Sequence, residues 1–186
     1  MNVYTKNIMN KYKNESVFKI NGSYSLSYHC HFIQGTCSFS EYTCLEKIIC
    51  DENEITALVD IPVTVTYINC KSNLITELDN LPENLTKLIC DSNRILSLNN
   101  LPNGLKFLSC DCNLINQLDN LPQGLVYLSC CSNPIVYLNC LPETLEVLYL
   151  YDMNKLVELN DLPNSINELL CDVNIETVSM KNFSNV

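Results

Sequence analysis

The sequence predicts a solenoid, a stack of similar coils that each contribute one short β-strand to a parallel sheet. Residues 81–100 (LPENLTKLICDSNRILSLNN) are followed at once by residues 101–120 (LPNGLKFLSCDCNLINQLDN), which repeat the same pattern 20 residues later. Most prolines and half of the cysteines recur at one fixed position of this repeat. A unit of this length cannot bury its own apolar face, so consecutive units must stack on one another.

Composition and charge restrict the class of protein. The chain has 186 residues, of which 47% are hydrophobic, and this is enough for one folded domain. Its formal net charge of −10 argues against nucleic acid or an anionic membrane as partner, because both need a basic face. The N-terminus lacks the apolar core of a signal peptide, and no later run approaches the roughly 20 apolar residues of a membrane span. We therefore expect a cytoplasmic protein with a basic or neutral protein partner.

The repeat unit reads L-x-x-L-x-C-x-x-N-x-I-x-x-L. The L-x-C part alternates with period 2, which is typical of a strand with one buried face. The following asparagine is expected to bond backbone groups of its own coil and of the next, where the chain turns away from the strand. This asparagine column comprises Asn53, Asn73, Asn93, Asn113, Asn133, Asn154 and Asn174.

The cysteines form a second column, which we expect to be buried and reduced. It comprises Cys30, Cys50, Cys70, Cys90, Cys110 and Cys130, and resumes at Cys171 after Leu150 has replaced one cysteine. Structural zinc needs four ligands that converge on a tetrahedron, whereas thiols in a column lie in a line about 5 Å apart. His29 and His31 would share one face of a strand and Cys30 the other, so a common metal there is awkward. The sequence therefore predicts no metal and no cofactor.

Three further cysteines, Cys112, Cys131 and Cys140, lie off the column at outward or loop positions and are the candidates for reactive thiols. Formation of a thiolate needs a base or a cationic neighbour, and the coils that contain these residues show none.

Three segments are predicted along the chain. Residues 1–40 form an N-terminal cap with faint periodicity at Tyr28, Cys30 and Ile33, residues 41–180 form about seven 20-residue coils, and residues 181–186 form a tail. A cap is expected because an uncovered end coil would leave apolar surface and a strand edge in water. A proline in every coil keeps the return segment extended and excludes a long helix there.

This repeat unit resembles the leucine-rich repeat, with cysteine at the second inward position of the strand. The 20-residue period and the recurring Leu-Pro are similar to the short type found in secreted effectors of pathogenic bacteria, and to the Cys- and Asn-rich arrays that giant viruses of amoebae encode. The resemblance implies a leucine-rich repeat solenoid, α/β by convention but mostly parallel β here. It has a concave parallel sheet, a polyproline-like convex side and little helix. Some bacterial effectors attach a ubiquitin-ligase domain to such repeats, whereas here only a few residues follow the last coil. The resemblance therefore implies the recognition half of such an effector without its catalytic half.

The side chains that alternate with the buried leucine and cysteine should face outward on the concave sheet. Exposed aromatic residues flanked by acids have the composition of a protein-binding hot spot. The alternative is that these aromatic residues only stabilise strand pairing, with Phe107 and Tyr127 stacked about 5 Å apart on adjacent strands. The predicted partner-binding residues are Tyr67, Lys87, Asp91, Phe107, Asp111, Tyr127, Tyr149 and Tyr151.

The sequence offers no catalytic constellation. It has two histidines, no glycine-rich phosphate loop and no carboxylate pair in a pocket-forming element. We expect a non-enzymatic protein-interaction module, monomeric or weakly homo-oligomeric, that binds a host factor in the host cytoplasm if its source is a virus or an intracellular bacterium. Two alternatives remain open. One is a substrate adaptor of a ubiquitin ligase, although residues 1–40 show no F-box-like helix pattern, and the other is a self-assembling structural protein that pairs through exposed strand edges.

Overall fold

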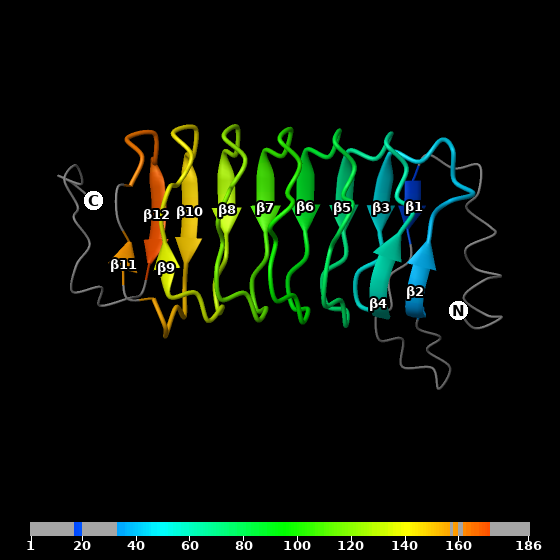
Figure 1. Cartoon of the computed structure of the whole chain (residues 1–186), viewed down its shortest axis with the longest axis horizontal. Coiled ribbons are helices and arrows are strands. Elements are labelled where there is room, and N and C mark those ends of the chain that lie inside the picture. The colour runs from blue at the N-terminus through cyan, green and yellow to red at the C-terminus, as the bar shows by residue number, and fades with distance from the viewer. Residues whose placement is uncertain (1–16, 20–32, 157, 160–161, 172–186) are drawn as a thin grey trace.

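The computed structural model describes residues 17–19, 33–156, 158–159 and 162–171. These residues contain no helix, and their strands form two layers, in each of which the strands lie side by side along the long axis of the molecule (Figure 1). Tyr28, His29, Cys30, His31, Asn174 and the predicted tail 181–186 lie outside the described residues.

The main sheet has eight parallel strands, one for each coil. In spatial order they are β1 (Val17–Lys19), β3 (Lys47–Ile49), β5 (Tyr67–Asn69), β6 (Lys87–Ile89), β7 (Phe107–Ser109), β8 (Tyr127–Ser129), β10 (Val147–Leu150) and β12 (Glu168–Cys171). Equivalent residues of adjacent repeats pair directly, as Lys87 does with Phe107 and Phe107 with Tyr127. The repeat therefore sets the strand register.

The second layer carries the return segments, and its strands run opposite to those of the main sheet (Figure 1). Parallel pairs form near its two ends, β2 (Gln34–Ser38) with β4 (Glu54–Val59), and β9 (Tyr137–Leu138) with β11 (Glu158–Leu159). Between these pairs the return segments are extended and joined by only one or two backbone hydrogen bonds, such as Arg94 N–H to Ile75 O at 2.8 Å. The predicted fold class, a parallel β-solenoid with an extended back, is confirmed.

The recurring prolines mark the turn that leads into each strand of the main sheet. In six coils the proline carbonyl accepts a hydrogen bond from the N–H three residues later, as Pro82 does from Leu85 at 2.9 Å. The same turn begins at Pro62, Pro102, Pro122, Pro142 and Pro163. Proline suits this position because its ring fixes φ and it has no N–H of its own to satisfy.

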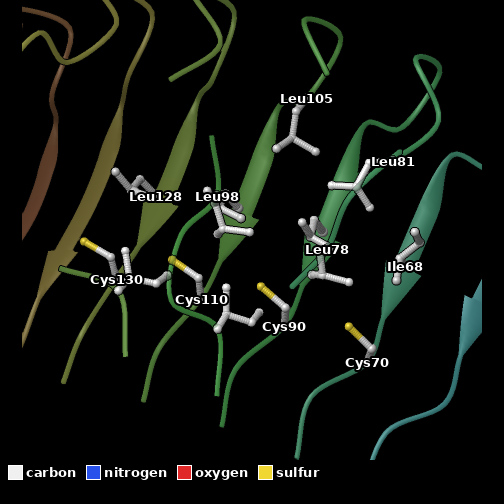
Figure 2. Packing of buried hydrophobic residues seen from close by; sticks show 14 of the residues in the cluster. Ile68, Cys70, Leu78, Leu81, Cys90, Leu98, Leu105, Cys110, Leu128 and Cys130 are labelled. Atoms are coloured by element: carbon white, nitrogen blue, oxygen red, sulfur yellow. The ribbon is translucent and has the colours of Figure 1, made fainter. Parts of the chain in front are cut away.

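The core lies between the two layers. In the coil that contains β6, Leu85, Leu88, Cys90 and Ile95 have no exposed surface, and Leu98 has 3%. The same positions are buried in the neighbouring coils, and the thiols of Cys70, Cys90, Cys110 and Cys130 line up in a row within this core (Figure 2).

The chain before residue 41 already contributes to the solenoid. β1 pairs with β3 at the edge of the main sheet, and Ile33 is fully buried. The N–H of Ile33 donates to Asn53 Oδ1 at 3.0 Å, as the N–H of Ile75 does to Asn93 Oδ1. Ile33 therefore has the position that Ile75 has in a regular coil.

The asparagine column connects each coil to the one before it. Asn93 Nδ2 donates to the carbonyls of Cys90 and Asp91 in its own coil and of Cys70 in the preceding coil, at 3.0, 3.1 and 3.0 Å. Its Oδ1 accepts from the N–H of Ile75, also in the preceding coil. The prediction that this asparagine also bonds backbone groups of the next coil is wrong. The Cys70 carbonyl and the Ile75 N–H, which lie beside the Asn93 side chain and pair with it, both belong to the preceding coil.

The asparagine column ends at Asn133 among the described coils, and the prediction for Asn154 is wrong. Asn133 follows Cys130 by three positions, and the same spacing after Leu150 places Met153 in the column. Met153 is 2% exposed, whereas Asn154 is exposed and donates to Asp152 Oδ1 at 2.7 Å. This coil has 21 residues, counted from Leu145 to Ile166, and its extra residue is therefore accommodated after Met153.

Candidate binding face

The candidate site is the face of the main sheet that points away from the core, called here the outer face. It has three columns of side chains. The first is Lys47, Tyr67, Lys87, Phe107, Tyr127, Val147 and Glu168, the second is Ile49, Asn69, Ile89, Ser109, Ser129, Tyr149 and Leu170, and the third is Asp51, Lys71, Asp91, Asp111, Cys131 and Tyr151. All eight residues predicted to bind a partner lie in these columns.

A row of stacked side chains crosses the outer face. The rings of Phe107 and Tyr127 stack with their centroids 4.0 Å apart and their planes 4° from parallel. Tyr149 contacts Tyr127 edge-on at 5.5 Å and 75°. On the other side, Lys87 Nζ lies 3.8 Å from the centroid of Phe107 and 6.0 Å from that of Tyr67. Because Phe107 lies between Lys87 and Tyr127, its ring presents mainly an edge to solvent.

Tyr149 is held in place by the last strand. Its hydroxyl donates to a carboxylate oxygen of Glu168. This hydrogen bond, more than burial, raises the pKa of Tyr149 to about 12. The hydroxyl therefore stays protonated at neutral pH. Tyr151, by contrast, is 53% exposed.

Below the aromatic row runs a polar ladder that joins successive coils. Asp91 Oδ1 accepts hydrogen bonds from Ser109 Oγ at 2.7 Å and from the N–H of Asp111 at 2.9 Å. Asp111 Oδ1 accepts in the same way from Ser129 Oγ and from the N–H of Cys131, both at 2.7 Å. Burial raises the pKa of the Asp91 carboxyl, although the bonds from Ser109 and Asp111 oppose this shift. Asp91 and Asp111 thus have a structural role that the sequence analysis did not assign.

Ser109 and Ser129 are the residues that sequence reasoning missed. They alternate with buried residues and so were expected to be exposed, but they are 8% and 2% exposed. The available signal was an aspartate 18 residues earlier, which in a 20-residue repeat lies diagonally across adjacent strands.

The polar ladder does not extend to Asp51. Asn69 stands where Ser109 and Ser129 supply hydroxyl groups to the later aspartates, and its Oδ1 accepts the N–H of Lys71 at 3.3 Å. Asp51 is 6% exposed, and its Oδ1 has no hydrogen-bond partner within the described part of the chain.

Five members of the cysteine column are buried and free, as predicted, whereas Cys171 is only half-buried; the five are Cys50, Cys70, Cys90, Cys110 and Cys130. Cys90 and Cys110 donate to the carbonyls of Ser109 and Ser129 in the next coil, both at 3.4 Å. Burial raises the pKa of the Cys70 thiol to about 12 and that of Cys90 well above its ordinary value. These thiols therefore remain protonated and unreactive at neutral pH.

The off-column cysteines differ in their environments. Cys112 and Cys140 are exposed. Cys131 is half-buried, accepts the N–H of Tyr151 at 3.2 Å, and has a pKa raised by burial. Cys131 is thus the least suited of the three to form a reactive thiolate.

Replacement of Cys112 by glycine is expected to stabilise the protein. Cys112 has a φ of 52°, in the left-handed region that a side chain disfavours by roughly 1 kcal/mol. Urea unfolding of Cys112→Gly should show a gain of roughly 0.5–1 kcal/mol. Cys44→Gly is the matched control, because Cys44 is also exposed but does not have a positive φ. A gain of the same size in Cys44→Gly would contradict the strain argument.

No group of three or more His, Cys, Asp or Glu side chains that could hold a metal occurs among the described residues. Nor does the described structure contain a helix long and apolar enough to cross a membrane.

Parallel strands at one per coil, a 20-residue period and an inner L-x-x-L-x-C-x-x-N pattern define a leucine-rich repeat solenoid of the short type. Neither a scan against protein-family models nor a search of curated proteins finds a match. Solved structures do match, and those described here are leucine-rich repeat proteins of bacteria.

The leucine-rich repeat domain of a Shigella effector aligns with a TM-score of 0.62 and 21% identity, over 84% of this chain and 66% of that one. The functional domain of InlJ from Listeria monocytogenes, which includes a cysteine ladder, aligns with a TM-score of 0.59 and 24% identity over 73% and 41% of the two chains. YopM, a leucine-rich effector protein from Yersinia pestis, gives 0.59 and 26% over 72% and 43%. The chain thus spans less than half the length of the InlJ and YopM chains. The fold and the 20-residue repeat confirm the predicted resemblance to leucine-rich repeats of the short, effector-like type.

Proposed function

We propose that this protein is a non-enzymatic interaction module that binds another protein through the outer face. The fold supports a protein-interaction repeat module, because the structural neighbours are effector-like leucine-rich repeat proteins. The observation that carries the assignment to the outer face is the continuous row of Tyr67, Lys87, Phe107, Tyr127 and Tyr149 across adjacent strands.

The row suits recognition because its side chains are already ordered. Stacking between Phe107 and Tyr127, and the bond from Tyr149 to Glu168, restrict these rings before any partner arrives. Binding therefore costs little side-chain entropy, and ring edges and hydroxyl groups remain available for contacts. Tyr151 adds an exposed ring at the end of the row.

The aromatic contacts also stabilise the sheet. Cross-strand aromatic pairs contribute roughly 0.2–1 kcal/mol each. The row could therefore serve folding alone, and the two roles are separated by variants that fold but have lost the rings.

Capture from eukaryotic cell lysate tests the proposal. The Phe107→Ser, Tyr127→Ser, Tyr149→Ser triple variant, shown by circular dichroism to be folded, should lose a protein that the wild type retains. The matched control is Leu96→Ser, Leu114→Ser, Tyr137→Ser, which removes three large exposed apolar residues from the return segments. Retention of the same proteins by wild type and by the outer-face variant would contradict binding at this face.

We propose a host protein as the partner and the host cytoplasm as the compartment, in keeping with the effectors among the structural neighbours. We also retain the division into a cap (residues 1–40), an array (41–180) and a tail (181–186) as a proposal. A captured ligase subunit that requires residues 1–40 would favour the adaptor alternative. A molecular size that grows with protein concentration would favour self-assembly.

A further inference from the structure

Charge is unevenly distributed along the outer face. Its first four strands carry Lys19 on β1, Lys47 on β3, Lys71 just after β5, and Lys87 on β6. The columns that continue over β7, β8, β10 and β12 contain no lysine or arginine at the described positions. The outer face therefore has a lysine half and an aromatic half.

The lysine half has a surplus of positive charge. Lys71 lies between Asp51 and Asp91 in its column, so its charge is balanced locally. Lys19 and Lys47 are exposed. Lys87 contacts the ring of Phe107, and in this contact its ammonium group donates no hydrogen bond to an acceptor atom. The four lysines exceed Asp51 and Asp91 by two charges, and this surplus remains to attract an anionic ligand.

The aromatic half is apolar, and its few charges are already engaged. Asp111 accepts hydrogen bonds from Ser129 and the N–H of Cys131, and Glu168 accepts from Tyr149. Beside them, Tyr151 and Leu170 are 53% and 45% exposed.

The acidic residues that give the protein its net charge of −10 lie largely elsewhere. Exposed acids occupy the loops and return segments, at Glu54, Asp60, Glu77, Asp79, Glu83, Asp119, Glu143 and Glu146. A basic partner, which the net charge favours, would be drawn to those surfaces and repelled by the lysine half.

We propose that the outer face binds an extended segment of a partner protein that has acidic residues at one end and apolar residues at the other. The segment binds in a single orientation. Its carboxylates lie over Lys19, Lys47 and Lys87, and its apolar residues lie over the aromatic half. This inference rests on the proposed function and specifies the chemistry of the partner. About six extended residues reach roughly 20 Å, which is enough to cover four strands spaced about 4.8 Å apart, whose first and last members lie roughly 14 Å from each other.

Three labelled peptides test the inference by fluorescence anisotropy with the full chain at low ionic strength. Each has six identical residues, two glycines and then Phe-Leu-Phe, and the six residues are glutamate, lysine or serine. The glutamate peptide should bind at least ten-fold more tightly than the other two, against the net charge of the protein. Tighter binding of the lysine peptide, or no difference among the three, would overturn the inference.

Charge reversal locates the effect. The Lys19→Glu, Lys47→Glu variant should lose the preference for glutamate, and raised salt should weaken the preference in the wild type. Lys106→Glu, Lys155→Glu is the matched control with the same change in charge. Both control residues are exposed, and the Lys106 ammonium lies beside Gly124 in the turn of the next coil. An equal loss in the control would assign the effect to net charge and overturn the inference.

The inference and the proposed function can fail separately. If a captured protein is lost with the Phe107, Tyr127 and Tyr149 variant but retained by Lys19→Glu, Lys47→Glu, the proposed function stands and the acidic segment is excluded. Tighter binding of a labelled oligothymidylate than of the glutamate peptide, through the same two lysines, would assign the lysine half to nucleic acid and overturn the inference.

Discussion

Asn93→Asp is expected to destabilise the protein by roughly 3–5 kcal/mol at pH 7, since it places a charge among buried acceptors. Asn93 is 9% exposed and donates to the carbonyls of Cys70, Cys90 and Asp91. A carboxylate can still accept the N–H of Ile75 but has no hydrogen for these three carbonyl oxygens. Asn93→Ala leaves the same groups unpaired without adding a charge, so its expected loss is smaller, roughly 2–4 kcal/mol.

Urea unfolding followed by circular dichroism measures this loss. Part of it should be recovered near pH 4, because burial raises the folded-state pKa of the introduced carboxyl above its unfolded value. With the pKa raised, the folded form is favoured at low pH and its stability falls as pH rises. Asn116→Asp, at an exposed position of a return segment, is the control and should change stability by less than about 0.5 kcal/mol. A loss in Asn93→Asp no larger than in this control would contradict the structural role of the column.

Alkaline pH is expected to unfold the protein steeply. Six cysteines have no exposed surface and are free, and burial raises the pKa of each thiol above the ordinary value of 9.0, to about 12 for Cys37 and Cys70; the six are Cys37 and the column residues Cys50, Cys70, Cys90, Cys110 and Cys130. Above pH 9 the unfolded chain loses these protons while the folded chain keeps them. The free energy of unfolding therefore falls with rising pH, by about 1.4 kcal/mol per pH unit for each thiol.

The stability from these thiols is fully present below about pH 9 and is lost as pH rises toward 12. Six thiols together lower the free energy of unfolding by about 8 kcal/mol per pH unit, so the fold should be lost near pH 10–11. Urea midpoints measured between pH 7 and 11 under a reducing agent would show this. Cys110→Val removes one buried thiol and should reduce the slope by about one sixth. Cys112→Ser changes an exposed cysteine and should leave the slope unaltered, and an equal reduction in both variants would contradict burial as the cause.

Most of the fold follows from the sequence because the repeat and the strand have simple periods. A 20-residue shift places equivalent residues opposite each other, and alternation with period 2 sends Leu88 and Cys90 inward and Lys87 outward. The buried position of Asn93 could also be predicted, because backbone N–H and C=O groups need hydrogen-bond partners where the chain leaves the strand.

Departures from the repeat could not be predicted in this way. The sequence alone allowed Asn154 to continue its column, whereas the structure keeps the three-residue spacing and buries Met153. The pairing of β1 with β3 also joins residues 30 positions apart, Val17 with Lys47, so the 20-residue period gives no signal for it. Insertions interrupt a periodic pattern, and only packing decides which side of the insertion keeps the register.

The sequence by itself determined the solenoid, the strand register of the regular coils, and the direction in which the eight side chains of the candidate site point. The tertiary structure alone decided how those side chains are engaged. It stacks Phe107 between Lys87 and Tyr127, and it ties Asp91 and Asp111 to serines of the following coils. The division is physical, because a period fixes which way a side chain points, whereas its partner depends on the reach and rotamer of a neighbour one coil away.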